Sequence, residues 1–212
     1  LGAMVYGDAD TERMVLNEES VWSGSPQENN IPGAYKQLPE IRRLLTEEKY
    51  AEANKLTRTA FKAQHTPKYA KGISPFGRFQ NLGNLYLTFS GNEEPVTQYR
   101  RELDLSTALG TVSYKRGAVE YSREHFVSKP DEVFVSRLSG PISFTAEMKR
   151  DERFETTAVS DTELLITGHL NDGFEKDGLQ YVGRLRVLAK GGSVKAEGAT
   201  LVVTEADEVI LM

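Results

Sequence analysis

The sequence contains no cysteine, one tryptophan and three histidines, and these shortages narrow what the chain can do. Without cysteine there are no disulfides, thiolate nucleophiles or Cys-rich zinc sites. No apolar run approaches the ~20 residues that cross a bilayer as a helix, and the opening LGAMVYGDAD does not resemble a signal peptide. The 31 acidic and 26 basic residues are spread along the chain, with a formal net charge of -5. Because no basic stripe could follow a phosphate backbone, nucleic acid is not an expected partner.

Short motifs for common chemistries are also missing. The sequence holds no Gly-x-Ser-x-Gly elbow, no phosphate-binding P-loop and no Gly-x-Gly-x-x-Gly fingerprint. His65, His125 and His169 lack metal-ligand spacing, and His125 is expected to decorate a strand. Segment 169–178 superficially resembles a calcium loop but lacks that loop's ligand, glycine and terminal glutamate register, which favours an ordinary turn. We therefore predict no metal, no cofactor and no catalytic residue within the chain.

Most of the chain shows the two-residue period of half-buried strands. Apolar residues alternate with polar ones in LYLTF at 85–89 and in ISFTAEM at 142–148. Further strand candidates occupy 96–105, 109–115, 118–127, 132–138, 163–170, 180–189, 200–204 and 208–212, and a first hairpin is expected within 1–17 around a turn at 7–10. About a dozen strands at hairpin spacing predict a mainly β fold of two stacked antiparallel sheets.

A helical insertion near 34–61 interrupts this pattern. Leu38, Ile41 and Leu45 share one stripe, and a second stripe continues from Tyr50, with a joint expected near 46–48. The flanking stretches 22–33 and 63–81 are rich in Gly, Pro, Ser and Asn and have no period, so both are predicted loops. Long loops of this kind are candidates for function or for packing against another domain.

The stretch LNEESVWSGSP, 16–26, precedes the first of these loops. Glu18 and Glu19 resemble an acid pair, but neighbours on an extended strand point to opposite faces and cannot flank one scissile bond. One of them could act with a distant carboxylate, or Glu18 could simply be solvated or cap a turn. Trp22 is interpreted first as core packing and second as an exposed aromatic at a sugar or domain interface.

Several longer stretches together resemble the N-terminal domain of glycoside hydrolase family 95, a family of α-L-fucosidases and relatives that act on α-L-galactosides. The most specific are LNEESVWSG and YRRELDL followed by VSY and REHFVS, and the similarity runs over essentially the whole chain. The resemblance implies a β-supersandwich that packs on a catalytic α/α barrel absent from this sequence. No residue here matches the family's catalytic motifs. The chain departs from the family at Asn81 and Asn84, where relatives usually have Pro and Asp, which puts a charge-based role of this loop in doubt.

We therefore interpret 1–212 as a single N-terminal β-sandwich domain with a helical insertion, and as a fragment of a longer enzyme because both ends read as strands. Its expected partners are the catalytic barrel of the same polypeptide and a fucosylated oligosaccharide. Candidate contacts to the barrel or the sugar-binding rim are Asn17, Glu18, Trp22 and Gln80. The alternative is a stand-alone carbohydrate-binding β sandwich, for which Tyr69, Phe76 and Phe79 are the comparable aromatic cluster. Bacterial-type relatives are often exported, but the sequence specifies no compartment.

Overall fold

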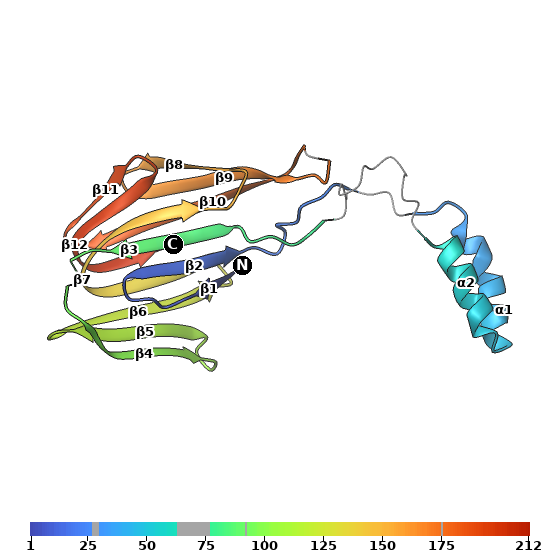
Figure 1. Ribbon diagram of the computed structural model, residues 1–212, viewed down its shortest axis with the longest axis horizontal. Helices are drawn as coiled ribbons and strands as arrows, with labels where there is room; N and C mark the ends of the chain where they lie inside the picture. The colour runs from blue at the N-terminus through green and yellow to red at the C-terminus, as the bar shows by residue number, and fades with distance from the viewer. Residues whose placement is uncertain (27–29, 63–76, 92, 175) are drawn as a thin grey trace.

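The computed structural model describes residues 1–26, 30–62, 77–91, 93–174 and 176–212. It confirms the predicted mainly β fold with antiparallel sheets and a helical pair (Figure 1). The strands are β1 (Gly2–Val5), β2 (Thr11–Asn17), β3 (Gly83–Phe89), β4 (Val96–Asp104), β5 (Leu109–Arg116), β6 (Val119–Ser128), β7 (Val133–Lys149), β8 (Phe154–Ser160), β9 (Glu163–Asn171), β10 (Asp177–Lys190), β11 (Ser193–Glu197) and β12 (Thr200–Leu211). The predicted first hairpin is β1–β2, with Val5 opposite Met14.

The long strands β7 and β12 connect two layers of sheet. The first half of β7 pairs with β6, and its last six residues pair with β3. Between these halves Gly140 has φ 124°, and a side chain there would approach the carbonyl of Glu120 to 3.0 Å, so glycine is needed at this bend. β12 follows β7 through the same bend with an irregular register around Ala206. One layer therefore contains β1–β3, and the other contains β4–β6 and β8–β10.

The core lies between these layers. Alternate residues of β3 and β7 are buried on one side, and alternate residues of β9 and β10 are buried on the other. The main cluster includes Met14, Leu85, Leu87, Leu138, Ile142, Phe144, Ala146, Met148, Leu164, Ile166, Leu170, Tyr181, Leu185, Val187, Leu201, Val203, Val209 and Leu211. The predicted alternation of apolar residues at 142–148 is therefore confirmed as the inner face of β7.

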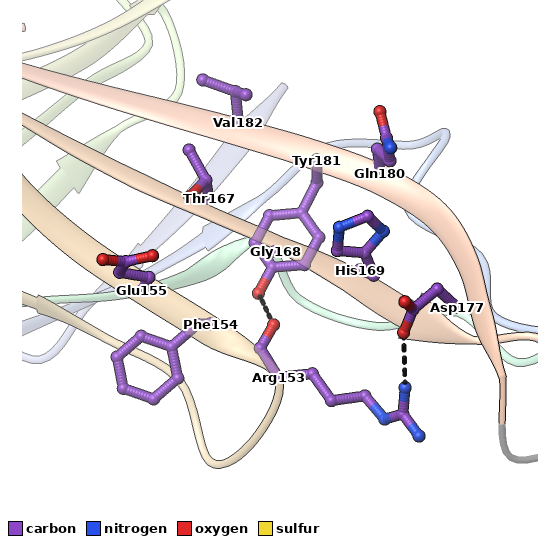
Figure 2. A pocket seen from close by; sticks show the side chains of 10 residues that line it. All are labelled: Arg153, Phe154, Glu155, Thr167, Gly168, His169, Asp177, Gln180, Tyr181 and Val182. Atoms are coloured by element: carbon purple, nitrogen blue, oxygen red, sulfur yellow. Dashed lines mark hydrogen bonds and ion pairs between the residues drawn. The ribbon is translucent and has the colours of Figure 1, made fainter.

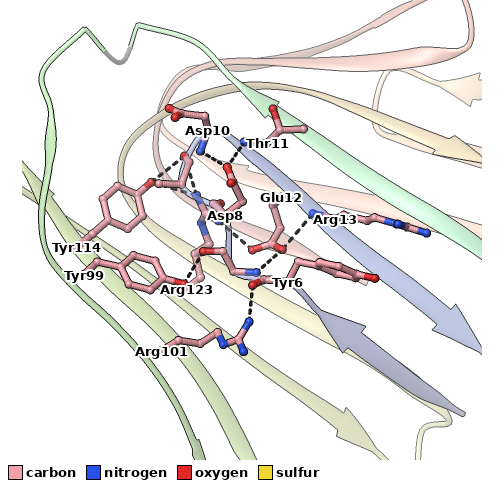
Figure 3. A network of polar contacts seen from close by, with 12 residues as sticks. Tyr6, Asp8, Asp10, Thr11, Glu12, Arg13, Tyr99, Arg101, Tyr114 and Arg123 are labelled. Atoms are coloured by element: carbon pink, nitrogen blue, oxygen red, sulfur yellow. Dashed lines mark hydrogen bonds and ion pairs between the residues drawn. The ribbon is translucent and has the colours of Figure 1, made fainter.

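A buried ion pair joins the two layers next to the first hairpin turn. Glu12 on β2 and Arg123 on β6 are both almost fully buried, and Arg123 Nη1 lies 2.9 Å from Glu12 Oε2 (Figure 3). The other carboxylate oxygen of Glu12 accepts the backbone N–H of Gly7 at 2.8 Å. Arg123 also donates to the carbonyl of Asp8 and stacks 4.2 Å from the ring centre of Phe89. Because both charged groups have several hydrogen-bonding or aromatic partners, the ion pair can be buried without leaving either charge unpaired.

The helical insertion consists of a 3-10 turn η1 (Ala34–Gln37), α1 (Leu38–Thr46) and α2 (Tyr50–Ala60), and it stands away from the sheets in Figure 1. The predicted joint is confirmed, with Glu48 at φ 58°. The predicted stripe is partly wrong, because Leu44 rather than Leu45 is buried and Tyr50 is exposed. The two short helices contact mainly each other, so only a narrow strip on each is covered. Neither helix in the described residues is long and apolar enough to span a membrane.

Candidate functional site at the Trp22 loop

The loop that follows β2 lies beside the loop that precedes β3. These two strands are antiparallel neighbours, so the chain continues side by side beyond their ends. The backbone N–H of Ser23 donates to the carbonyl of Arg78 at 3.0 Å, and the N–H of Gln80 donates to the carbonyl of Val21 at 2.9 Å. The described parts of both predicted loops therefore form one structure at the end of the sandwich.

Trp22 is the most exposed large side chain of this site. The residue is 52% exposed, which shows that the interpretation as core packing is wrong. The ring of Phe79, itself 47% exposed, meets it edge to face with centres 5.8 Å apart. The indole Nε1–H donates to the carbonyl of Glu19 at 2.9 Å, which fixes the ring while leaving its face open. The Trp22–Phe79 aromatic pair is the kind of surface that stacks on sugar rings or packs against another domain.

Tight backbone contacts hold the aromatic pair in place. A side chain at Gly77 would come within 2.3 Å of the carbonyl oxygen of Ser23, so only glycine allows the two loops to approach this closely. On the other side, the N–H of Gly24 donates to the carbonyl of Asn171 at 2.8 Å. This bond joins the turn between β9 and β10 to the site, and Figure 1 shows all three segments at the same end of the sheets.

The other predicted contact residues lie in or beside this site and are held by local hydrogen bonds. Gln80 accepts a bond from the Arg150 guanidinium at 2.9 Å through its side-chain oxygen. Asn17 ends β2, and its amide donates to the carbonyl of Val15 at 3.4 Å. These bonds match the loop-stabilising role weighed for both residues, and their contacts with a barrel or a sugar remain predictions.

Glu18 and Glu19 do not lie on an extended strand as the sequence suggested, because β2 ends at Asn17 and both residues enter a turn. The Glu18 carboxylate accepts hydrogen bonds from the hydroxyl and the N–H of Ser20. The hydroxyl of Ser20, followed by its N–H, lowers the pKa of the Glu18 carboxyl below its usual value. A carboxylate held ionised in this way can accept a hydrogen bond from a sugar hydroxyl but is a poor proton donor at neutral pH.

The turn at 171–177 is built by side chains that bond to their own backbone. Asn171 Oδ1 accepts the N–H of Gly173 at 2.7 Å, and Asp172 Oδ1 accepts the N–H groups of Phe174 and Lys176 at 2.7 and 2.9 Å. These are the Asx turns expected of an ordinary polar connection. In the part of the chain that the structure describes, no group of three or more histidine or carboxylate side chains is placed to hold a metal ion.

An open groove of about 440 Å³ lies next to this turn on the surface of β8, β9 and β10 (Figure 2). No sequence pattern predicts this groove, because its residues come from three strands. Glu155, Thr167 and Val182 form one cross-strand row, and His169 and Gln180 form the next. The groove is lined by these residues and by Arg153, Phe154, Gly168, Asp177 and Tyr181. Hydrogen-bonding groups beside a partly exposed aromatic ring can bind a small polar ligand such as a sugar.

The family model for the glycosyl hydrolase family 65 N-terminal domain matches residues 1–212. The chain belongs to this family. Membership confirms the expected glycoside hydrolase N-terminal domain. The matching model is described as family 65, whereas the sequence resemblance was to family 95. The chain is 33% identical over its full length to "Alpha-L-fucosidase 2" of Arabidopsis thaliana, of which it covers 27%.

Two fungal proteins are also similar to this chain. The chain is 27% identical over its full length to "Probable alpha-fucosidase A" of Aspergillus niger, of which it covers 26%. It is also 27% identical, over 66% of its length, to the protein of the same name from Aspergillus oryzae, of which it covers 18%. The chain thus spans about a quarter or less of the length of these relatives, which have other parts beyond the matched region.

Proposed function

We propose that residues 1–212 are the non-catalytic N-terminal domain of a family 95 α-L-fucosidase, whose inverting hydrolysis of α-L-fucosides takes place in a separate α/α barrel of the same polypeptide. The main support is that relatives named as fucosidases match this chain over about a quarter of their length. In this proposal the domain packs on the barrel and shapes its rim. The Trp22–Phe79 aromatic pair supplies the contact surface, since both rings are exposed and held by their backbone surroundings.

Activity of the intact polypeptide tests this function. The full-length protein is expected to release fucose from fucosylated oligosaccharides, whereas residues 1–212 alone are expected to release none. Release of fucose by residues 1–212 would place the catalytic groups inside this chain. A full-length protein that is folded but inactive on every fucoside would refute the assignment to the fucosidases.

The Trp22→Ala variant of the full-length protein tests the role of the aromatic pair. Loss of one aromatic contact of about 1.4 kcal/mol should lower kcat/KM for an oligosaccharide about tenfold. An aryl fucoside too small to reach the rim should be hydrolysed at an unchanged rate. Tyr35→Ala is the matched control, because Tyr35 is an aromatic residue on the helical insertion that is even more exposed than Trp22. Equal kcat/KM values for Trp22→Ala and Tyr35→Ala on the oligosaccharide would show that Trp22 does not contribute to substrate binding at the rim.

A stand-alone carbohydrate-binding module is the second candidate, and the groove on β8–β10 is the observation that favours it. Of the aromatic cluster named from the sequence, Phe79 lies in the Trp22–Phe79 pair, and Tyr69 and Phe76 fall outside the described residues. Calorimetric titration of residues 1–212 with fucosylated oligosaccharides separates the candidates. Measurable affinity that is lost in the Phe154→Ala variant would support the carbohydrate-binding module. The absence of measurable heat would support the non-catalytic domain that packs on the barrel.

A further inference from the structure

His125 is a buried side chain without hydrogen-bond partners. It is only 5% exposed, and neither of its ring nitrogens meets a donor or acceptor among the described residues. The hydroxyl of Ser136, directly opposite on β7, is fully buried and also unpartnered. His125 lies on a strand, β6, as expected, but its side chain is buried. Buried polar atoms are almost always paired in folded proteins, so three unpaired atoms on two neighbouring residues require an explanation.

These residues lie on the inner face of β6 and β7, and His125 lines a groove of about 640 Å³ between the two layers. Ala3 and Val5 of β1 form one wall, and Leu103 of β4 belongs to the other. Most of the remaining lining is apolar, and it includes Val112, Phe126, Val127 and Phe134. The ring of Phe134 stacks nearly parallel to that of His125 with centres 6.2 Å apart, and both ring nitrogens of His125 are buried from solvent.

The groove is closed at one end by the contacts that tie the first hairpin turn to β4. Tyr99 donates its hydroxyl to the carbonyl of Gly7 at 2.8 Å, and Arg101 donates to the carbonyl of Tyr6 at 2.5 Å (Figure 3). Both acceptors follow β1, and within the described residues no hydrogen bond joins β1 itself to β4. The groove lies between β1 and β4, where Ala3, Val5 and Leu103 line it.

Both walls of the groove are edge strands, but their edges differ in chemistry. In the described part of the chain, β1 pairs with β2 alone and β4 pairs with β5 alone. β4, with the sequence VTQYRRELD, carries charges that discourage another strand from adding to it. β1, with the sequence GAMV, carries none. An uncharged edge with free N–H and C=O groups can accept an extended polypeptide, whereas a small molecule would leave most of those groups unpaired.

We propose that an extended segment of the same polypeptide, from outside residues 1–212, lies along β1 and fills the groove over His125. This inference rests on the proposed function, because the additional polypeptide is that of the longer enzyme. The relatives are roughly four times as long as the matched region, which supplies enough chain for the contact. Apolar side chains of the segment cover Ala3, Val5 and Leu103. Because both ring nitrogens of His125 are buried, a hydrogen bond from the segment to the imidazole requires the ring to turn towards the groove.

Cysteine reactivity tests this contact, because the natural chain has no cysteine. Ala3→Cys places a thiol in the groove, and Leu103→Cys is a second reporter on the opposite wall. Met4→Cys is the matched control, since Met4 is the next residue of β1 and is 59% exposed. Each variant of the full-length protein is treated with a maleimide in native buffer and in denaturant. The ratio of the two reaction rates gives the protection of that thiol.

We expect protection of at least about 100-fold for Ala3→Cys and Leu103→Cys in the full-length protein, and less than about tenfold for Met4→Cys. In residues 1–212, the groove thiols should react about as fast as the control. Full reactivity of both groove thiols in the full-length protein would overturn the proposal. Protection in residues 1–212 that grows with protein concentration would also overturn it, because a second copy would then be the occupant.

The activity of the same full-length preparations separates this inference from the proposed function. Fucosidase activity together with reactive groove thiols would refute the groove contact and leave the function intact. Protected groove thiols in a protein that hydrolyses no fucoside would refute the function and support the contact.

Discussion

The titration of His125 should make the free energy of unfolding of residues 1–212 depend on pH. Burial, followed by the nearby positive charge of Arg123, lowers the pKa of His125 from 6.5 to about 4. Arg101 and Glu102 of β4 are the other charged residues that line the groove. The unfolded chain therefore binds a proton near pH 6.5, while the folded chain resists it down to about pH 4.

The sign of the effect follows from this difference. The contribution of His125 to folding is fully present above pH 6.5 and is lost as the pH falls towards 4, because protonation favours the unfolded state over that interval. The gap between the two pKa values corresponds to about 3 kcal/mol of unfolding free energy. The His125→Phe variant removes this pH dependence and keeps a ring that can stack on Phe134. Because it also removes two unpaired nitrogens, its stability at pH 7 should equal or exceed that of the natural chain by up to about 2 kcal/mol.

Urea unfolding followed by circular dichroism at pH 7 and pH 4 measures both quantities. Carboxylates also titrate over this interval, so the informative number is the difference between the natural chain and His125→Phe. The natural chain should lose about 3 kcal/mol more than the variant. Equal losses would show that His125 is solvated or paired in solution. An imidazole resonance of His125 that titrates near its ordinary pKa would refute the reasoning independently.

Two further substitutions test the packing of the sandwich by urea unfolding. Glu12→Ala leaves the buried Arg123 charge without its partner and should cost about 3–5 kcal/mol, whereas replacing both residues with apolar side chains should recover much of that loss. A loss below about 1 kcal/mol for Glu12→Ala would mean that water reaches the pair. Gly168→Ala should cost at least about 2 kcal/mol, because the new methyl group would lie 2.0 Å from the carbonyl oxygen of Arg153. Gly2→Ala, with no atom within 4 Å of the added methyl, is its control, and equal stabilities of these two variants would contradict the predicted clash.

The strands could be predicted because their signal is local. Alternation along β3 and β7 reflects one buried face per strand, and this pattern needs no knowledge of distant residues. The same alternation places Glu12 on the face of Met14, so its burial had a local signal. What makes that burial tolerable is Arg123, 111 residues away, and no local pattern predicts this pairing.

The Trp22 loop was harder to predict because its structure depends on contacts between segments. A single tryptophan among small polar residues is compatible with burial or exposure, and the outcome depends on the close approach of Gly77 to Ser23. The helical stripe shows the same limit, since Leu44 and Leu45 differ only in which one faces α2. The β8–β10 groove combines residues from three strands and had no counterpart in the sequence.

Arg123 and His125 are neighbours on the inner face of β6, but their surroundings differ sharply. Arg123 is surrounded by a carboxylate, two carbonyls, a tyrosine hydroxyl and an aromatic ring from its own chain. His125, two residues further along the same face, has the ring of Phe134 and no polar partner among the described residues. A buried guanidinium needs more hydrogen-bond partners than a neutral imidazole, and this fold supplies them to Arg123. The same fold would be expected to supply partners to His125 as well. In the proposed contact, a segment between β1 and β4 would supply the polar partner that His125 lacks once its ring turns towards the groove.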